Sequence, residues 1–186
     1  MSPCVRTALV TFALSGALVP SRATAQAPNN FPNARAYVVN VCPSILLSNF
    51  SYLNQSDARG ASEKFHQNLS WKNIGSQPLV AFEVVILKYD AFNRRMAATS
   101  WTVTGHNSAN WRPLTAGTTD GDSTLSDGYE EVFTAVAYVR AARHVDGTVW
   151  RVNESDVLRG LRALNTGITD FGDVRPDSLP SHRRLP

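Results

Sequence analysis

Apolar and polar side chains alternate with a period of two through the central part of the chain. Between residues 64 and 72, Phe65, Leu69 and Trp71 share one face, Gln67 is the exception on that face, and polar residues occupy the other. This pattern is typical of a half-buried β-strand. β-forming residues also predict strands at residues 36–41, 79–89, 97–103, 131–143 and 148–152. The polar stretch from 105 to 128 predicts loops with one short strand near 111–115.

Two local signals mark the end of the strand-rich region. Asp146-Gly147 lies between two β-rich runs, which predicts a hairpin with a type I′ turn. A helix is expected over residues 154–164, capped by Asn153 with Asp156 reaching back, and ended near Gly167. Its apolar face consists of Val157, Leu158, Leu161 and Leu164.

These elements favour a mainly β fold. Six or seven short strands at hairpin spacing predict an antiparallel immunoglobulin-like sandwich with one C-terminal helix, and a partly open barrel is the alternative. We expect one domain over residues 35–172, a flexible lead-in at 28–34 and a disordered, proline-rich tail at 173–186.

The first 27 residues have the three parts of a secretory signal. Arg6 precedes an apolar stretch of about a dozen residues, and small residues in an Ala-x-Ala pattern end at Ala27. The apolar stretch is shorter than the roughly 20 residues that a membrane span needs. We therefore expect signal cleavage after Ala25 or Ala27, a periplasmic or secreted bacterial protein, and no stable membrane span afterwards.

Charge and cysteine content narrow the picture further. Removal of Arg6 and Arg22 with the signal leaves 16 basic against 15 acidic residues, which argues against nucleic acid as a partner. Cys42 is then the remaining cysteine, so no disulfide within the chain can form. A lone thiol of this kind is expected to be buried and inert, with an intermolecular bridge or a reactive thiol as alternatives.

One strand resembles a known family. The segment from Phe82 to Asp90, which ends in Tyr-Asp, is similar to the strand that marks FxLYD-type and related immunoglobulin-like domains of bacterial exported proteins. The preceding Trp71-Lys-Asn-Ile-Gly-Ser-Gln-Pro-Leu resembles the entry to that strand, whereas Lys88 departs from the motif, which has Leu before Tyr. The resemblance implies an immunoglobulin-like fold outside the cytoplasm, and no catalytic residues.

The two long strands predicted at residues 79–89 and 131–143 carry apolar residues on both faces. Val85, Leu87 and Tyr89 lie opposite Phe82, Val84 and Ile86. Because one face of a sandwich strand normally meets water, something must cover the second face. The helix is the expected cover, and a dimer or partner interface is the alternative.

No catalytic or metal motif stands out. The four histidines lack zinc-ligand spacing, no nucleophile elbow or phosphate loop occurs, and no cofactor is expected. Asp120, Asp122 and Asp127 form a weak calcium candidate on a polar loop that lacks the closing Glu of an EF-hand.

A polar loop around Trp111 is the expected binding surface. An exposed indole can stack on a sugar ring or on a partner side chain, and His106, Asn107 and Arg112 flank Trp111. The sequence therefore predicts a non-enzymatic exported module that binds a protein partner or another copy of itself as an accessory subunit of the cell envelope. A carbohydrate- or envelope-binding module is the alternative, and a hydrolase with a dispersed active site is the third hypothesis.

Overall fold

The computed structural model describes residues 35–56, 63–105, 112–127 and 132–176, which form eight strands and one helix. The elements, in chain order, are β1 (Arg35–Val39), β2 (Ile45–Ser56), β3 (Glu63–Asn73), β4 (Leu79–Tyr89), β5 (Arg95–Thr104), β6 (Thr119–Asp127), β7 (Thr134–His144), β8 (Val149–Arg151) and α1 (Glu154–Ala163).

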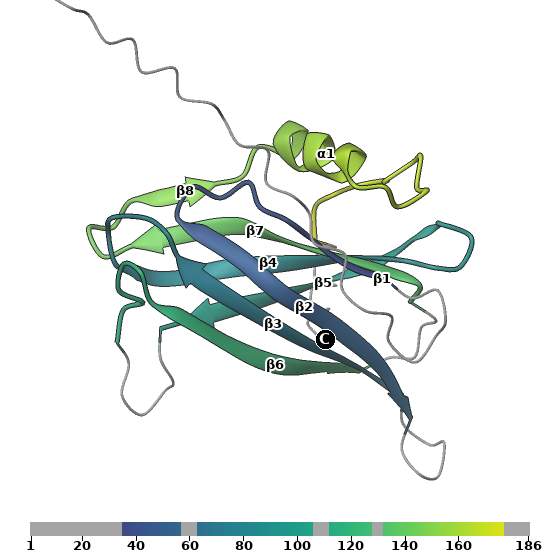
Figure 1. The fold of residues 1–186 in the computed structure, drawn as a ribbon, viewed down its shortest axis with the longest axis horizontal. Helices are drawn as coiled ribbons and strands as arrows, with labels where there is room; N and C mark the ends of the chain where they lie inside the picture. The colour runs from purple at the N-terminus through teal and green to yellow at the C-terminus, as the bar shows by residue number, and fades with distance from the viewer. Residues whose placement is uncertain (1–34, 57–62, 106–111, 128–131, 177–186) are drawn as a thin grey trace, which may run out of the picture.

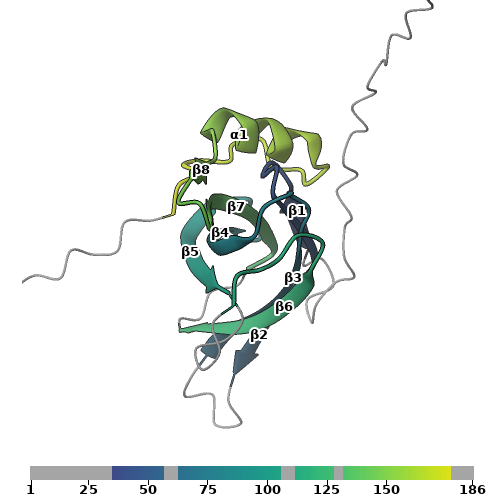
Figure 2. The same cartoon turned by 90° about the vertical axis from the view of Figure 1, so that its left-hand side faces the viewer.

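The strands form two sheets that pack face to face, and the helix adds a third layer (Figures 1 and 2). The larger sheet has the order β1-β7-β4-β5, with β8 also paired to β7, and the smaller has the order β2-β3-β6. The mainly β sandwich with one C-terminal helix is thus confirmed. One pairing departs from the expected antiparallel arrangement, because β1 runs parallel to β7.

The core between the sheets is built by the alternation that the sequence shows. Phe82, Val84 and Ile86 of β4 belong to the same buried cluster as Leu69 and Trp71 of β3. All five side chains are at most 3% exposed. Burying each large apolar side chain contributes about 1.5–3 kcal/mol to stability, and this burial holds the two sheets together.

The second face of β4 is covered by the chain itself. Val85, Leu87 and Tyr89 are fully buried in a second cluster, to which Val157 and Leu161 of α1 belong. Helix α1 lies over this sheet, on the side away from β2, β3 and β6 (Figure 2). These three β4 residues are therefore core, and the alternative hypothesis that they form a partner interface is wrong.

Helix α1 begins and ends close to its expected bounds. The Asn153 side chain accepts a hydrogen bond from the backbone N–H of Ser155, as an N-cap residue does. Asp156 contacts Arg159 at 3.0 Å, and this contact replaces the capping-box role expected for its carboxylate. Gly167 has a φ of 77°, which places it in a turn after the helix has ended.

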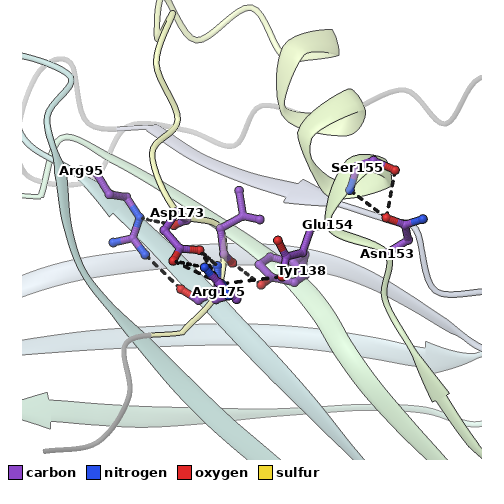
Figure 3. A network of polar contacts seen from close by, with 8 residues as sticks. Arg95, Tyr138, Asn153, Glu154, Ser155, Asp173 and Arg175 are labelled. Carbon is purple, nitrogen blue, oxygen red and sulfur yellow. Dashed lines mark hydrogen bonds and ion pairs between the residues drawn. The ribbon is translucent and has the colours of Figure 1, made fainter.

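The segment after α1 is also part of the domain (Figure 3). Ile168, Phe171 and Val174 are buried against the second face of the larger sheet. The side chain of Arg95 donates hydrogen bonds to the backbone oxygens of Asp173 and Arg175. The expected tail boundary at residue 173 is therefore wrong, since packed chain continues at least to Arg175.

Strand β2 has no counterpart among the expected strands, and a bulge explains why. The register against β3 shifts between Ser48 and Ser51, and Asn49 there has a φ of 51°. Inward-facing positions consequently change parity along the strand, so that no single period of two runs through it. The buried side chains of β2 are Ile45, Leu47, Phe50 and Tyr52.

Two further local expectations need correction. Residues 119–127, expected as loop, form strand β6, because the free edge of β3 supplies hydrogen-bonding partners for a segment of low β propensity. The described part of the short strand near 111–115 is reduced to a single bridge between Leu114 and Leu79. The β7–β8 hairpin is confirmed, but its turn is not type I′, since Gly147 has positive φ and Asp146 does not.

Candidate binding groove

A groove of about 510 Å³ opens along the side of the sandwich where β5 and β6 form the edges of the two sheets. Its volume falls within the range of small-ligand sites, roughly 300–1,000 Å³. The described residues that line it are Trp71, Leu79, Val80, Ala81, Phe82, Trp101, Thr102, Val103, Thr104, Gly105, Leu114, Asp120, Gly121 and Asp122.

The apolar wall of the groove is an aromatic cluster. Trp71 packs edge-on against Trp101, with ring centroids 5.7 Å apart, and against Phe82 at 5.3 Å. Trp71 and Phe82 are buried, whereas Trp101 is half-buried. Such T-shaped contacts fix the ring orientations, so the indole of Trp101 is held in place where β5 meets the groove.

The opposite wall is polar because of the register of β6. Asp120 pairs with Trp71 and Asp122 with Leu69, so both aspartates lie on the face of the smaller sheet that carries these core residues. On β5, the face turned towards the core between the sheets carries Trp101 and Val103, which pair with core residues of β4. Carboxylates therefore stand across from an indole at this open side of the sandwich.

Strand β5 also brings backbone polar groups to the groove. Among the described strands it pairs with β4 and with no other. The backbone N–H of Gly105 donates to Val80 O, so the N–H and C=O groups of Thr104 and Thr102 point away from β4 under antiparallel alternation. Both threonines line the groove, so among the described residues no strand pairs with this edge along the rim.

The binding surface expected around Trp111 is only partly described. Trp111, His106 and Asn107 lie outside the described residues, while Arg112 is exposed next to the segment that leads to Leu114. The hypothesis that these four residues act together stays a prediction. Two described tryptophans line the groove, the buried Trp71 and the half-buried Trp101, which the sequence predicts only as part of a strand.

The aspartates expected as a weak calcium site do not lie on a loop. Asp120 and Asp122 belong to strand β6 and not to a flexible loop, and nothing can be said of the Asp127 side chain. Each of the first two carboxylates accepts a hydrogen bond from the next backbone N–H in the chain. Within the described ranges, no group of three or more His, Cys, Asp or Glu side chains could hold a metal ion.

A serine and a histidine that are 100 residues apart meet outside the described lining of the groove. Ser44 Oγ lies 3.0 Å from Nε2 of His144, and Nδ1 of His144 lies 3.2 Å from Thr148 Oγ1, which donates to Asp146. This is nucleophile–base distance, but Ser44 is only 7% exposed, and neither residue is among the described lining of the groove. The contact therefore ties the start of β2 to the β7–β8 hairpin.

Cys42 is buried, and burial raises the pKa of its thiol. Two backbone hydrogen bonds, from Ser44 and Ile45, oppose this effect and are smaller. Because the thiolate is the reactive form of cysteine, this environment suits a packing role.

In the part of the chain that the structure describes, no helix is long and apolar enough to cross a membrane.

No family model matches the sequence, and neither does any curated protein. Among solved structures, a hypothetical protein from Peptoclostridium difficile 630 is 9% identical with a TM-score of 0.42, and the match covers 62% of this chain and 89% of that one. The putative ApaA protein from Bordetella pertussis is 16% identical with a TM-score of 0.35, covering 58% of this chain and 85% of that one. Likeness at this level carries no functional argument.

Proposed function

We propose that the protein is an exported, non-enzymatic binding module that recognises a protein partner at the groove between β5 and β6. The proposal is supported by the backbone edge of β5 at Thr102 and Thr104, which no described strand pairs, beside the fixed indole of Trp101. Exposed sheet edges bind extended partner segments by strand addition, and aromatic side chains are enriched in the buried centres of protein interfaces.

The rest of the fold supports this choice of surface. The second face of the larger sheet is covered by α1 and the segment that follows it, and the described apolar side chains of β4 and β7 on that face are buried. The secretory signal pattern at residues 1–27 and the resemblance to FxLYD-type domains support a periplasmic or secreted setting. An accessory subunit of the cell envelope fits both features.

Site-specific photo-crosslinking in the native envelope tests the proposal. Benzoylphenylalanine would replace Thr102 on the groove rim, and in a matched control it would replace Arg162 on the exposed side of α1. We expect a discrete adduct, identified by mass spectrometry as one envelope protein, from position 102 only. Equal adducts from both positions, or none from position 102, would contradict a partner at the groove.

Carbohydrate binding is the second candidate function, and one observation favours it. Trp101 and Asp122, whose side chains lie on the inward faces of β5 and β6, line the same groove. Sugars bind by stacking on an indole while hydroxyl and carboxylate groups fix their orientation. A glycan array probed with the wild-type protein and with Trp101→Ala would detect such binding and its loss.

A further inference from the structure

We infer that the binding site extends past Trp101 to a polar subsite formed by Gln67 and Thr99, which receives an uncharged carboxamide side chain, asparagine or glutamine, from the partner. This inference rests on the proposed function and names the side-chain chemistry of its partner. It is carried by two buried oxygen atoms that have no hydrogen-bond partner among the described residues, Gln67 Oε1 and Thr99 Oγ1.

Both oxygen atoms are unusual for the interior of a protein. The Gln67 side chain is 3% exposed, and Thr99 Oγ1 is buried although its residue is half-buried. Buried polar groups are almost always hydrogen-bonded, because an unpaired one costs stability. Methionine and valine would fill the same two positions without this cost. Oxygens that stay unpaired within the protein are therefore suited to a group that a binding partner supplies.

Two contacts between the sheets show how β3 and β4 lie against each other. Trp71 packs on Phe82 with ring centroids 5.3 Å apart, and Lys88 Nζ lies 5.4 Å from the centroid of the Phe65 ring. The residue numbers fall along β3, from 71 to 65, as they rise along β4, from 82 to 88. The two strands therefore run antiparallel across the core, in step with each other.

This alignment brings Gln67 and Thr99 to the same level of the core. Gln67 lies two residues from Phe65, and Ile86 lies two residues from Lys88, each on the inward face of its strand. Ile86 in turn pairs with Thr99 of β5. The two unpaired oxygens thus belong to one polar layer between the sheets.

The polar layer adjoins the groove on the open side of the sandwich. Thr99 lies two residues from Trp101, on the same face of β5. On β6, Thr124 pairs with Gln67 and lies two residues from Asp122, on the same face. Thr99 and Thr124 are half-buried, and no described strand lies between β5 and β6 on this side. A partner side chain that enters beside Trp101 therefore points towards the two oxygens.

The two oxygens require a particular kind of side chain. Gln67 Oε1 only accepts hydrogen bonds, whereas the Thr99 hydroxyl both donates and accepts. A carboxamide offers N–H donors and a C=O acceptor on neighbouring atoms, so it serves both oxygens at once. A carboxylate has no hydrogen to donate to Gln67, and an ammonium or guanidinium group would lose its hydration between the sheets. Serine and threonine carry the hydroxyl on Cβ, too close to their own backbone to reach past the indole.

Variants of the subsite, combined with the crosslinker at position 102, test the inference in the full chain. Gln67→Met and Thr99→Val remove one oxygen each, and Thr99→Ser keeps the hydroxyl as the matched control. We expect the yield of the position-102 adduct to fall about tenfold in the first two variants and to stay within about twofold of the wild type in Thr99→Ser. Urea unfolding should show that Gln67→Met and Thr99→Val are no less stable than the wild type, which separates lost binding from lost folding.

A synthetic peptide of the crosslinked segment identifies the side chain that enters the subsite. We expect the segment sequenced from the adduct to contain asparagine or glutamine within about four residues of the attachment point. Replacing that residue with leucine or methionine should weaken binding of the peptide to the wild type about tenfold and should not weaken its binding to Gln67→Met. This non-additivity measures the contact between the carboxamide and Gln67.

Several results would overturn the inference. They are an adduct yield that Gln67→Met and Thr99→Val leave unchanged, an equal loss in Thr99→Ser, and a crosslinked segment without asparagine or glutamine. Any of these, with a discrete adduct from position 102, would leave the proposed function standing. No adduct from the wild type, together with a glycan-array signal that Trp101→Ala removes, would instead refute the proposed function and this inference together.

Discussion

Gly160 of α1 lies so close to Val39 of β1 that a Cβ atom added to the glycine would overlap the Val39 Cγ1 methyl group. The absence of a side chain at this position sets how closely the helix approaches the sheet. The sealing of the second face of β4 therefore depends on one residue of α1 whose only contribution is its small size.

Gly160→Ala should destabilise the protein although alanine favours helix. The higher helix propensity of alanine stabilises the folded protein by about 1 kcal/mol, but overpacking against Val39 destabilises it by about 1–3 kcal/mol. We expect the free energy of unfolding in urea to fall by about 1 kcal/mol. Arg162→Ala, on the exposed side of the same helix, should change it by less than about 0.5 kcal/mol. A more stable Gly160→Ala protein would show that the helix sits further from β1.

Two polar side chains in the sandwich offer a stabilising substitution. Gln67 is 3% exposed, and its Oε1, like Thr99 Oγ1, is a buried atom without a hydrogen-bond partner among the described residues. Gln67→Met and Thr99→Val keep the volume and remove the unpaired atom, so each should raise the free energy of unfolding by about 1 kcal/mol. Thr102→Val, the same change at an exposed position, should have little effect. A loss of stability in the first two variants would reveal a partner for these oxygens.

Tyr89 links strand β4 to the segment after α1, and its contribution to stability should depend on pH. Its hydroxyl donates to Phe171 O at 3.1 Å, and burial raises the pKa of Tyr89 to about 12. Because the folded-state pKa lies above the unfolded value of about 10, the stabilisation is complete below pH 10 and is lost as the pH rises towards 12. Tyr89→Phe should therefore cost about 1 kcal/mol at pH 8 and less at pH 11, by urea unfolding. A difference that grows with pH would contradict this sign.

Cys42 should be inert in the folded protein. It is 6% exposed, and its raised thiol pKa keeps the thiolate population low at pH 8. We expect reaction with iodoacetamide at least about 100-fold slower in the folded state than in concentrated guanidinium chloride, with mass spectrometry as the readout. Rapid labelling of the folded protein would instead identify an accessible thiol.

The sequence predicts those parts of this fold whose burial follows a regular period. The strand Leu79–Tyr89 and the helix Glu154–Ala163 match their expected ranges closely, since each has an uninterrupted pattern of apolar positions. Strand β2 was missed because the bulge at Asn49 changes the parity of its buried side chains. Strand β6 was missed because its pairing with β3 depends on residues about 50 positions away, and not on its own composition.

The groove is harder to predict from the sequence than the strands are. Trp101 and Asp122 each looked ordinary in its own segment, one in a strand and the other in a presumed loop. Only the pairing of β6 with β3 and of β5 with β4 places these two segments on facing edges. The hypothesis of a tryptophan-containing binding surface keeps its chemistry, with the half-buried Trp101 as the tryptophan, while the part that rests on Trp111 stays a prediction.

Amide hydrogen exchange in the free protein, read residue by residue by NMR, tests most directly whether β5 has a free edge over the groove. The amides of Trp101 and Val103 face β4 and should exchange slowly, while those of Thr102 and Thr104 face the groove and should exchange at least about tenfold faster. Slow exchange at all four positions would mean that this edge is already paired, and would contradict the account of the binding site.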